Sequence, residues 1–393
     1  MGDSGNPTAS YRWAILTGEY PPQAGGVSDF TRLTAEQLAA AGDEVHVWAP
    51  PADQPELSPT SVTVHRLPDR FGPRSLWRLH RDLAALPRPF RLLVQYVPQA
   101  FGFKGMNLPF ALWVAGQPIA RPEVLFHEFA VWPGRGLPFK TNVIGWVTHV
   151  MATLLANRAS RILVATPAWS GKLRRFAPGC RPVWQPIPST IGEEAPAETA
   201  EIRGRLLGPD GVTTLVGHFS AYGAVIVPGL RDALAELLTL DAGLRVVLIG
   251  RGSDRFRSEF LATHPQFTAR LVATGGGDAS TITAHIAACD VMMQPFPSGV
   301  TTRNTSVTVS LALGRALVTS QGPLTEPMWH DEGIAVLTPA NNGRAMAEAV
   351  VGLARNPLER VRLCQRAAEL YRQRFALDVA VAHLREPPAS ACR

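Results

Sequence analysis

The sequence predicts an α/β protein built from two Rossmann-like, doubly wound domains in series, and three observations lead to this prediction. Apolar strand-like runs alternate with helical patterns along most of the chain. The alternation stops once, around residues 188–212, and then starts again. The length of 393 residues also exceeds the roughly 250–300 residues at which one hydrophobic core stops growing. Alternation of this kind is typical of parallel sheets with helices on both faces.

Seven strand-like runs define a first domain, expected over residues 1–190. The runs are residues 13–20, 44–50, 61–67, 91–98, 123–129, 161–167 and 182–188. Helices are expected over residues 28–41 and 142–158. Ser28 is a suitable N-cap for the earlier helix and Gly42 a suitable C-terminal stop.

A polar, acidic segment rich in proline and glycine, residues 191–211, is predicted to be the linker to a second domain over residues 212–370. The strand-like runs of that domain are residues 213–220, 245–252, 269–275, 290–296, 316–322 and 334–340. Helices are expected over residues 228–240 and 343–355. In doubly wound sheets ligands bind at the carboxyl ends of the strands, so we expect the site there.

The net charge of +6 is unevenly distributed. Residues 1–190 contain 19 Lys and Arg against 12 Asp and Glu, whereas residues 191–393 contain 19 against 20. No lysine follows Lys172, which excludes a Schiff-base or phosphate-binding lysine from the second domain.

Part of the basic excess lies in an amphipathic segment, residues 73–87, with Arg74, Arg78 and Arg81 beside a stripe of leucines. Such a helix can lie on an anionic membrane, or it can turn its leucines toward the sheet and leave its arginines in water. The sequence leaves both alternatives open. It contains no aromatic and basic RNA-binding module, so we expect no nucleic-acid partner.

The cysteines predict a reducing compartment. They have none of the spacings that zinc or redox sites use, and they are Cys180, Cys289, Cys364 and Cys392. The N-terminus lacks the features of a signal peptide, and the most apolar stretch, residues 143–156, is shorter than a membrane span. We therefore expect a cytoplasmic protein.

Two glycine motifs bear on ligand type. Gly250 and Gly252 follow a strand, but Arg255 stands where a dinucleotide fingerprint has its third glycine, so a nicotinamide enzyme is disfavoured. Gly25 and Gly26 open the first predicted helix, where backbone N–H groups favour an anion such as a phosphate. A tight loop without a ligand is the alternative.

Residues 19–50, EYPPQAGGVSDFTRLTAEQLAAAGDEVHVWAP, closely resemble the opening of family 4 retaining glycosyltransferases of the GT-B fold. The resemblance continues, in the family's order, through residues 216–223, 247–253, 289–296 and 310–326. It implies two domains that face each other across a cleft, with a C-terminal helix within residues 371–393 that returns to the first domain.

The resemblance also implies an activity. It implies a hexosyltransferase that takes a nucleotide-diphosphate sugar as co-substrate and needs no metal or other cofactor. The acceptor would be a glycan, lipid-linked or small molecule, with a role in cell-surface polysaccharide synthesis. In this family the departing phosphate oxygen is pictured as accepting the acceptor's proton, so no general base is required.

The sequence departs from the family in two places. The family's paired glutamates align with Thr301 and Val309, so both carboxylates are missing. Its Arg and Lys after the first strand of the second domain are replaced by His218, Ser220 and Tyr222. These losses keep open a second reading, a non-catalytic GT-B protein that binds a glycan or a protein.

Other groups must then hold the donor diphosphate. We expect Arg303, Thr305 and Ser306, at the start of a helix over residues 307–313, to contact it, although a capped helix with a surface arginine has the same pattern. The remaining donor-binding candidates are Gly25, Gly26, His218, Ser220, Gly250, Arg251, Thr274 and Glu326.

The alignment gives two positions a sugar-binding role. Glu326 matches a family glutamate that holds ribose or sugar hydroxyls, or it is an ordinary carboxylate at a helix start. His127 and Glu128, at the end of a first-domain strand, are the catalytic candidates because that strand end faces the transferred sugar in such enzymes. A purely structural pair is the alternative.

Overall fold

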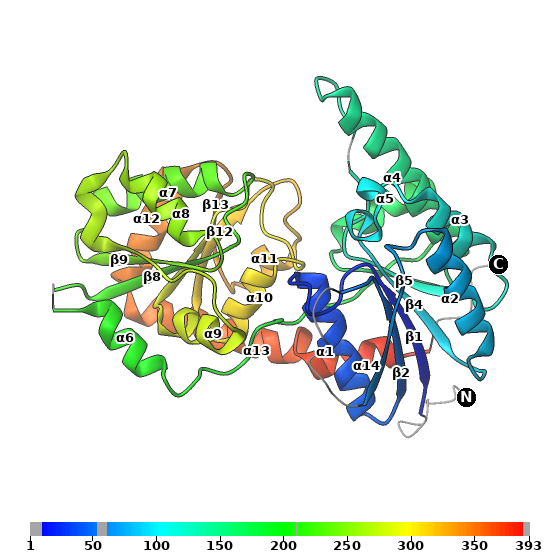
Figure 1. The fold of residues 1–393 in the computed structure, drawn as a ribbon. Coiled ribbons are helices and arrows are strands. Elements are labelled where there is room, and N and C mark those ends of the chain that lie inside the picture. The colour runs from blue at the N-terminus through cyan, green and yellow to red at the C-terminus, as the bar shows by residue number, and fades with distance from the viewer. Residues whose placement is uncertain (1–9, 53–60, 132, 210, 388–393) are drawn as a thin grey trace. The chain divides into compact units, whose positions relative to one another are not determined.

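The protein is described by a computed structural model that covers residues 10–52, 61–131, 133–209 and 211–387. The chain forms two compact units (Figure 1). The first domain comprises residues up to 186 together with those from 380 onward, and the second comprises residues 187–379. Each has its own parallel sheet and its own helices, which confirms the prediction of two Rossmann-like domains.

The first domain is a seven-stranded sheet in the order β3-β2-β1-β4-β5-β6-β7, with every pairing parallel. Its strands are β1 (Arg12–Thr17), β2 (Glu44–Ala49), β3 (Val62–Arg66), β4 (Arg91–Tyr96), β5 (Pro122–Phe126), β6 (Arg161–Val164) and β7 (Val183–Trp184). Its α-helices are α1 (Gly26–Ala40), α2 (Pro73–Ala85), α3 (Leu108–Gly116), α4 (Phe139–Arg158) and α5 (Ala168–Phe176). Short 3₁₀ turns, η1 (Pro98–Phe101) and η2 (Phe103–Gly105), follow β4.

The second domain is a six-stranded sheet in the order β10-β9-β8-β11-β12-β13, again parallel throughout. Its strands are β8 (Thr214–Phe219), β9 (Leu244–Ile249), β10 (Leu271–Ala273), β11 (Val291–Gln294), β12 (Ala316–Gln321) and β13 (Val336–Pro339). Its helices are α6 (Thr199–Leu207), α7 (Val227–Leu240), α8 (Ser253–Leu261), η3 (Pro265–Arg270), α9 (Ala279–Ala288), α10 (Thr305–Ala312), α11 (Met328–Asp331), α12 (Gly343–Ala354) and α13 (Pro357–Arg374).

One interior strand of each sheet, β1 and β9, is buried on both faces. In β1 every residue after Arg12 is buried, and in β9 all six residues are buried. Since successive side chains of a strand point to opposite faces, helices must cover both sides of each sheet. This doubly wound arrangement leaves the strand ends as the places where polar side chains can reach water.

The segment predicted as a linker differs from the expectation. Within it, α6 forms part of the second domain and buries Ile202 against Ala284 and Ala288 of α9. Arg203 adds an ion pair with Asp290 at 3.0 Å. The described residues of the segment on either side of α6 have the irregular structure that the composition indicates.

The predicted last helix is two helices, α13 and α14 (Leu377–Arg385), and the chain rejoins the first domain from Ala380 onward. There Arg91 binds both carboxylate oxygens of Glu123, at 2.6 and 2.7 Å, and donates to the carbonyl of Leu384 at 2.8 Å. Arg161 donates to the carbonyl of His383 at 2.8 Å. Cations at a helix C-terminus satisfy its last carbonyls, so these arginines dock the returning helix.

Candidate functional site

The carboxyl edge of the second sheet gathers most of the predicted donor-binding residues. The strand order reverses between β8 and β11, which is where doubly wound sheets bind ligands. The residues that follow the strands at this edge are Ser220 after β8, Gly250 and Arg251 after β9, Thr274 after β10, Arg303, Thr305 and Ser306 after β11, and Glu326 after β12. Residues far apart in the sequence thus come to one edge.

The loops after β8, β9 and β10 form one connected group. Gly250 has φ 107° and its Cα faces the carbonyl of Ser220 so closely that a Cβ would clash. The N–H of Gly250 donates to the carbonyl of Gly275 at 3.2 Å, and that of Thr274 to Leu248 at 3.0 Å. The structure therefore brings Ser220, Gly250 and Thr274 together.

Arg251 is an exposed cation in this group. It has no ion pair among the described residues, whereas the neighbouring Arg255 pairs with Glu259 at 3.2 Å. Arg251 lines a hollow of about 250 Å³ beside the start of α8. The other residues that line it are Ala221, Tyr222, Val227, Gly252, Arg255, Phe256 and Glu259.

The loop that leads to α10 is held by the buried carboxylate of Glu326. Its oxygens accept from the backbone N–H of Thr302, at 3.1 Å, and from the Thr302 hydroxyl at 2.9 Å. The indole Nε1–H of Trp329 donates to it at 2.8 Å. Glu326 is 4% exposed. These contacts correct the expected role, because the carboxylate serves the protein's own loop rather than presenting itself to a sugar.

The same loop closes against the one after β12. Gly299 has φ 87°, and a Cβ there would collide with Gly322 and Thr325. A Cβ on Gly322 would lie 2.6 Å from the carbonyl carbon of Ser298. Only glycine permits this approach of the two backbones.

The start of α10 presents polar groups at the edge. Thr305 and Ser306 are half-buried, and their hydroxyls have no hydrogen-bond partner among the described residues. The first N–H groups of any helix lack intrahelical acceptors and carry a partial positive charge. Arg303 lies two residues before the helix. The arrangement can bind an anionic group.

The positions of the missing family glutamates have structural uses. Thr301 is buried, and its N–H and hydroxyl both donate to Oδ1 of Asn304, at 2.7 and 2.8 Å. Val309 is fully buried on the inner side of α10. Neither residue offers a substitute for a carboxylate.

His218 is a core residue, which corrects its expected role in donor binding. It is 1% exposed, and its Nδ1–H donates to the carbonyl of Met293 at 2.8 Å. Burial lowers the pKa of His218 to about 4, so the ring is neutral near neutrality. It lies edge-on to Tyr222, whose hydroxyl donates to the carbonyls of His218 and Ile249.

In the first domain His127 and Glu128 follow β5, as expected. The Nε2 of His127 hydrogen-bonds Oε1 of Gln95 at 2.7 Å, and because that oxygen only accepts, Nε2 carries the proton. The ring lies edge-on to Phe30. Gln95 thereby fixes both the orientation and the tautomer of the histidine.

Glu19, which was not among the candidates expected from the sequence, lies with Glu128 at this edge. Burial raises the pKa of Glu19, the positive charge of Arg70 opposes that rise, and the negative charge of Glu128 adds to it. A Cβ on Gly25 would lie 2.6 Å from Oε2 of Glu19. The signal was present in the Gly-Glu-Tyr turn after the first strand.

This carboxylate also changes the expectation for Gly25 and Gly26. α1 begins at Gly26, two residues earlier than predicted, and the hydroxyl of Ser28 donates to the carbonyl of Gln23 instead of capping the helix. The start of α1 therefore faces the protein's own negative charge. A phosphate here would be repelled by Glu19, so the structure favours the tight-loop alternative.

The basic segment, residues 73–87, turns its leucines toward the sheet, which is the second of the two alternatives left open by the sequence. Leu76, Leu79 and Leu83 of α2 pack into the core of the first domain. Arg78 and Arg81 both pair with Asp82, at 3.5 and 3.3 Å. In the described part of the chain, no helix combines the length and apolarity needed to cross a bilayer.

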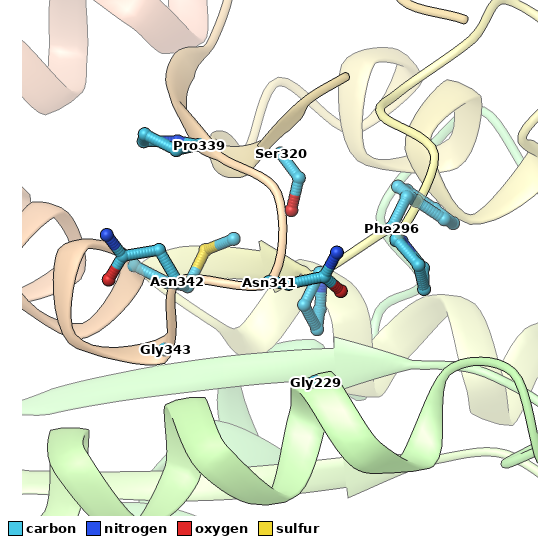
Figure 2. A pocket seen from close by; sticks show the side chains of 10 residues that line it. Gly229, Phe296, Ser320, Pro339, Asn341, Asn342 and Gly343 are labelled. Carbon is cyan, nitrogen blue, oxygen red and sulfur yellow. The ribbon is translucent and has the colours of Figure 1, made fainter. Parts of the chain in front are cut away.

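A small cavity lies at the carboxyl ends of β11, β12 and β13 (Figure 2). Phe296, Ser320 and Asn341 point toward it. Its volume of about 10 Å³ holds at most one water molecule. It is too small to be a substrate site.

Among residues 10–52, 61–131, 133–209 and 211–387, no group of three His, Cys, Asp or Glu side chains could hold a metal ion. Cys289 and Cys364 are free thiols, and burial raises the pKa of Cys289 to about 12. Cys180 is half-buried. Cys392 lies outside the described residues.

Comparison with known proteins places this geometry in context. Residues 25–183 match the model of the glycosyl transferase 4-like domain. Among curated proteins no sequence matches the chain.

Solved structures share the fold across both domains. Sucrose-phosphate synthase from Thermosynechococcus elongatus has a TM-score of 0.73 at 17% identity, covering 95% of this chain and 97% of that one. HepE from Anabaena, in complex with UDP and glucose, has 0.65 at 15%, covering 95% and 98%. WaaG, a glycosyltransferase involved in lipopolysaccharide biosynthesis, has 0.64 at 14%, also covering 95% and 98%. At these identities the likeness establishes the GT-B fold.

Replacing Glu326 tests its structural role. Glu326→Ala leaves the donors of Thr302 and Trp329 buried without an acceptor, so the free energy of unfolding of the second domain should fall by about 3 kcal/mol in urea titrations. The exposed Glu348→Ala, which removes a surface ion pair with Arg344, should change it by less than about 1 kcal/mol. Equal stability of the Glu326 variant and the wild type would contradict the assigned role.

Acid should destabilise the second domain through His218. Because the folded-state pKa is depressed to about 4, protons bind the unfolded chain more readily. The stabilisation is present above the ordinary pKa of about 6.5 and is lost as pH falls toward 4. Between about pH 7 and about pH 5 the wild type should lose about 2 kcal/mol more stability than His218→Gln. Parallel stability curves for the two proteins would show that the ring is not held neutral.

Proposed function

We propose that this chain, of which residues 25–183 belong to the glycosyl transferase 4-like domain family, is a glycosyltransferase that uses a nucleotide-diphosphate sugar. The observation that carries the proposal is the carboxyl edge of the second sheet, where the start of α10, two hydroxyls and two arginines gather. The shared fold with a structure in complex with UDP and glucose supports it. The acceptor we propose is a glycan, lipid-linked or small molecule, in cell-surface polysaccharide synthesis.

The chemistry we assign to this edge is stabilisation of the leaving diphosphate. When the bond between the sugar's anomeric carbon and the phosphate oxygen breaks, negative charge develops on that oxygen. The N–H groups and hydroxyls of Thr305 and Ser306, with Arg303 and Arg251, supply preorganised donors for this charge. They replace the lysine that the second domain lacks.

In the proposed retaining reaction the departing phosphate oxygen accepts the proton of the acceptor hydroxyl as the new glycosidic bond forms on the same face. The chain then needs neither a general base nor a metal ion. We assign His127 and Glu128 to hydrogen bonds with the transferred sugar or the acceptor. The Gln95 contact fixes the orientation of the histidine ring for that purpose.

Non-catalytic binding of a glycan or a protein is the second candidate. It is favoured by Thr301 and Val309 in place of carboxylates and by the commitment of Glu326 to Thr302 and Trp329. A membrane contact through Arg74, Arg78 and Arg81 has weaker support, since Asp82 pairs with two of these arginines.

Titration calorimetry with UDP, GDP and ADP tests the donor site. Arg303→Ala and Ser306→Ala should each weaken binding of the preferred nucleotide roughly tenfold, because each removes a donor to a charged phosphate. Arg205→Ala, which removes the same charge from the exposed surface of α6, is the matched control and should leave affinity unchanged.

Three outcomes distinguish the proposed donor site, the enzyme and the non-catalytic candidate. Unchanged affinity in both variants, with the wild type binding a nucleotide, would place the phosphates elsewhere. Nucleotide binding with release of product from a UDP, GDP or ADP sugar supports the enzyme. Absence of binding and turnover with the whole panel would overturn it in favour of the non-catalytic candidate.

A further inference from the structure

The outer face of α4 is apolar where it meets water. Phe139 is 82% exposed, Trp146 is 67% exposed and Val150 is 49% exposed. With the half-buried Val143 they follow the spacing of one helical stripe. We call these four residues the α4 stripe.

The opposite side of α4 is already occupied by the first domain. Gly145, Thr148 and Met151 are buried there. The loop before the helix is fixed to it, since the N–H of Val131 donates to the Thr148 hydroxyl at 3.1 Å and that of Gly134 to Asn142 at 2.9 Å. The helix is thus apolar on both sides, although a helix between a core and water normally has a polar outer face.

The stretch of chain that contains the α4 stripe carries charge of one sign. No Asp or Glu occurs between Glu128 and Glu193, a segment that includes the whole of α4. Arg135 and Lys140, next to the stripe, are both exposed. Figure 1 shows the first turns of α4 extending away from the sheet of their own domain.

We propose that the α4 stripe binds an anionic lipid surface. Phe139, Trp146 and Val150 enter the interfacial region of the lipid, where aromatic side chains are favoured, and Arg135 and Lys140 meet lipid phosphates. A second copy of the chain fits this face less well, because a symmetric contact would bring the same basic residues together without a carboxylate. The inference does not depend on the proposed sugar transfer.

α2 provides a matched comparison within the same domain. Trp77 is also 67% exposed and, with Arg74 and Arg78, lines a hollow of about 490 Å³. However, the guanidinium of Arg81 lies over the Trp77 ring at 5.2 Å, and Asp82 pairs with Arg78 and Arg81. Trp77 therefore serves as a control for Trp146, because it is equally exposed but lies where the positive charge is partly neutralised.

Vesicle flotation of the full chain, without nucleotide or acceptor, tests the proposal. The wild type should float with vesicles of phosphatidylcholine and phosphatidylglycerol, and added salt should weaken the association. Phe139→Ser with Trp146→Ser should weaken it at least tenfold, and removal of the charges of Arg135 and Lys140 roughly fivefold for each charge. Trp77→Ser should leave it unchanged. Thermal unfolding and nucleotide titration of each variant check that the fold and the donor site are intact.

Other results would overturn the inference. They are no flotation of the wild type, full flotation of the α4 double variant, or a loss that appears with Trp77→Ser instead. A wild-type dimer in sedimentation that becomes monomeric in the double variant, with no flotation of either, would show that a second copy covers the stripe.

Discussion

The arrangement of the second domain's edge depends on one buried carboxylate. Glu326 accepts hydrogen bonds from the Thr302 backbone, the Thr302 hydroxyl and the Trp329 indole. A charge with so little contact with water is tolerated only when such donors surround it. By holding the loop at Thr302, Glu326 sets where α10 begins, and so where Arg303, Thr305 and Ser306 lie. The alignment assigned Glu326 to substrate binding. We infer instead that Glu326 positions the three residues to which we assign the substrate.

This constraint supports the proposal that a domain without lysine binds a diphosphate. A helix start supplies N–H donors with fixed direction, which cost no reorganisation when negative charge develops. Arg251 and Arg303 add charge on either side of the point where the strand order reverses. The first domain differs, because Glu19 and Glu128 place carboxylates at its edge beside His127, with Arg70 close enough to act on Glu19. We therefore assign the proposed diphosphate to the second domain's edge and neutral hydroxyls to the first domain's edge.

The fold could be predicted from the sequence because strand and helix periods are local properties. The helix within the predicted linker could not be predicted, since α6 is held by residues distant in the sequence. One such contact is the ion pair of Arg203 with Asp290, 87 residues later. The roles of single side chains were predicted wrongly for the same reason, because they depend on residues distant in the sequence. Nothing near His218 in the sequence indicates that its ring donates to the carbonyl of Met293, 75 residues later. The outer stripe of α4 was hidden because its apolar residues read as ordinary core positions.

Hydrogen exchange, followed by mass spectrometry with and without the preferred nucleoside diphosphate, tests the central claim most directly. If the diphosphate is bound by the second domain's edge, exchange should slow in peptides that cover residues 250–252 and 299–306, while the start of α1 stays unchanged. Protection confined to the start of α1, or none at saturating nucleotide, would contradict the account.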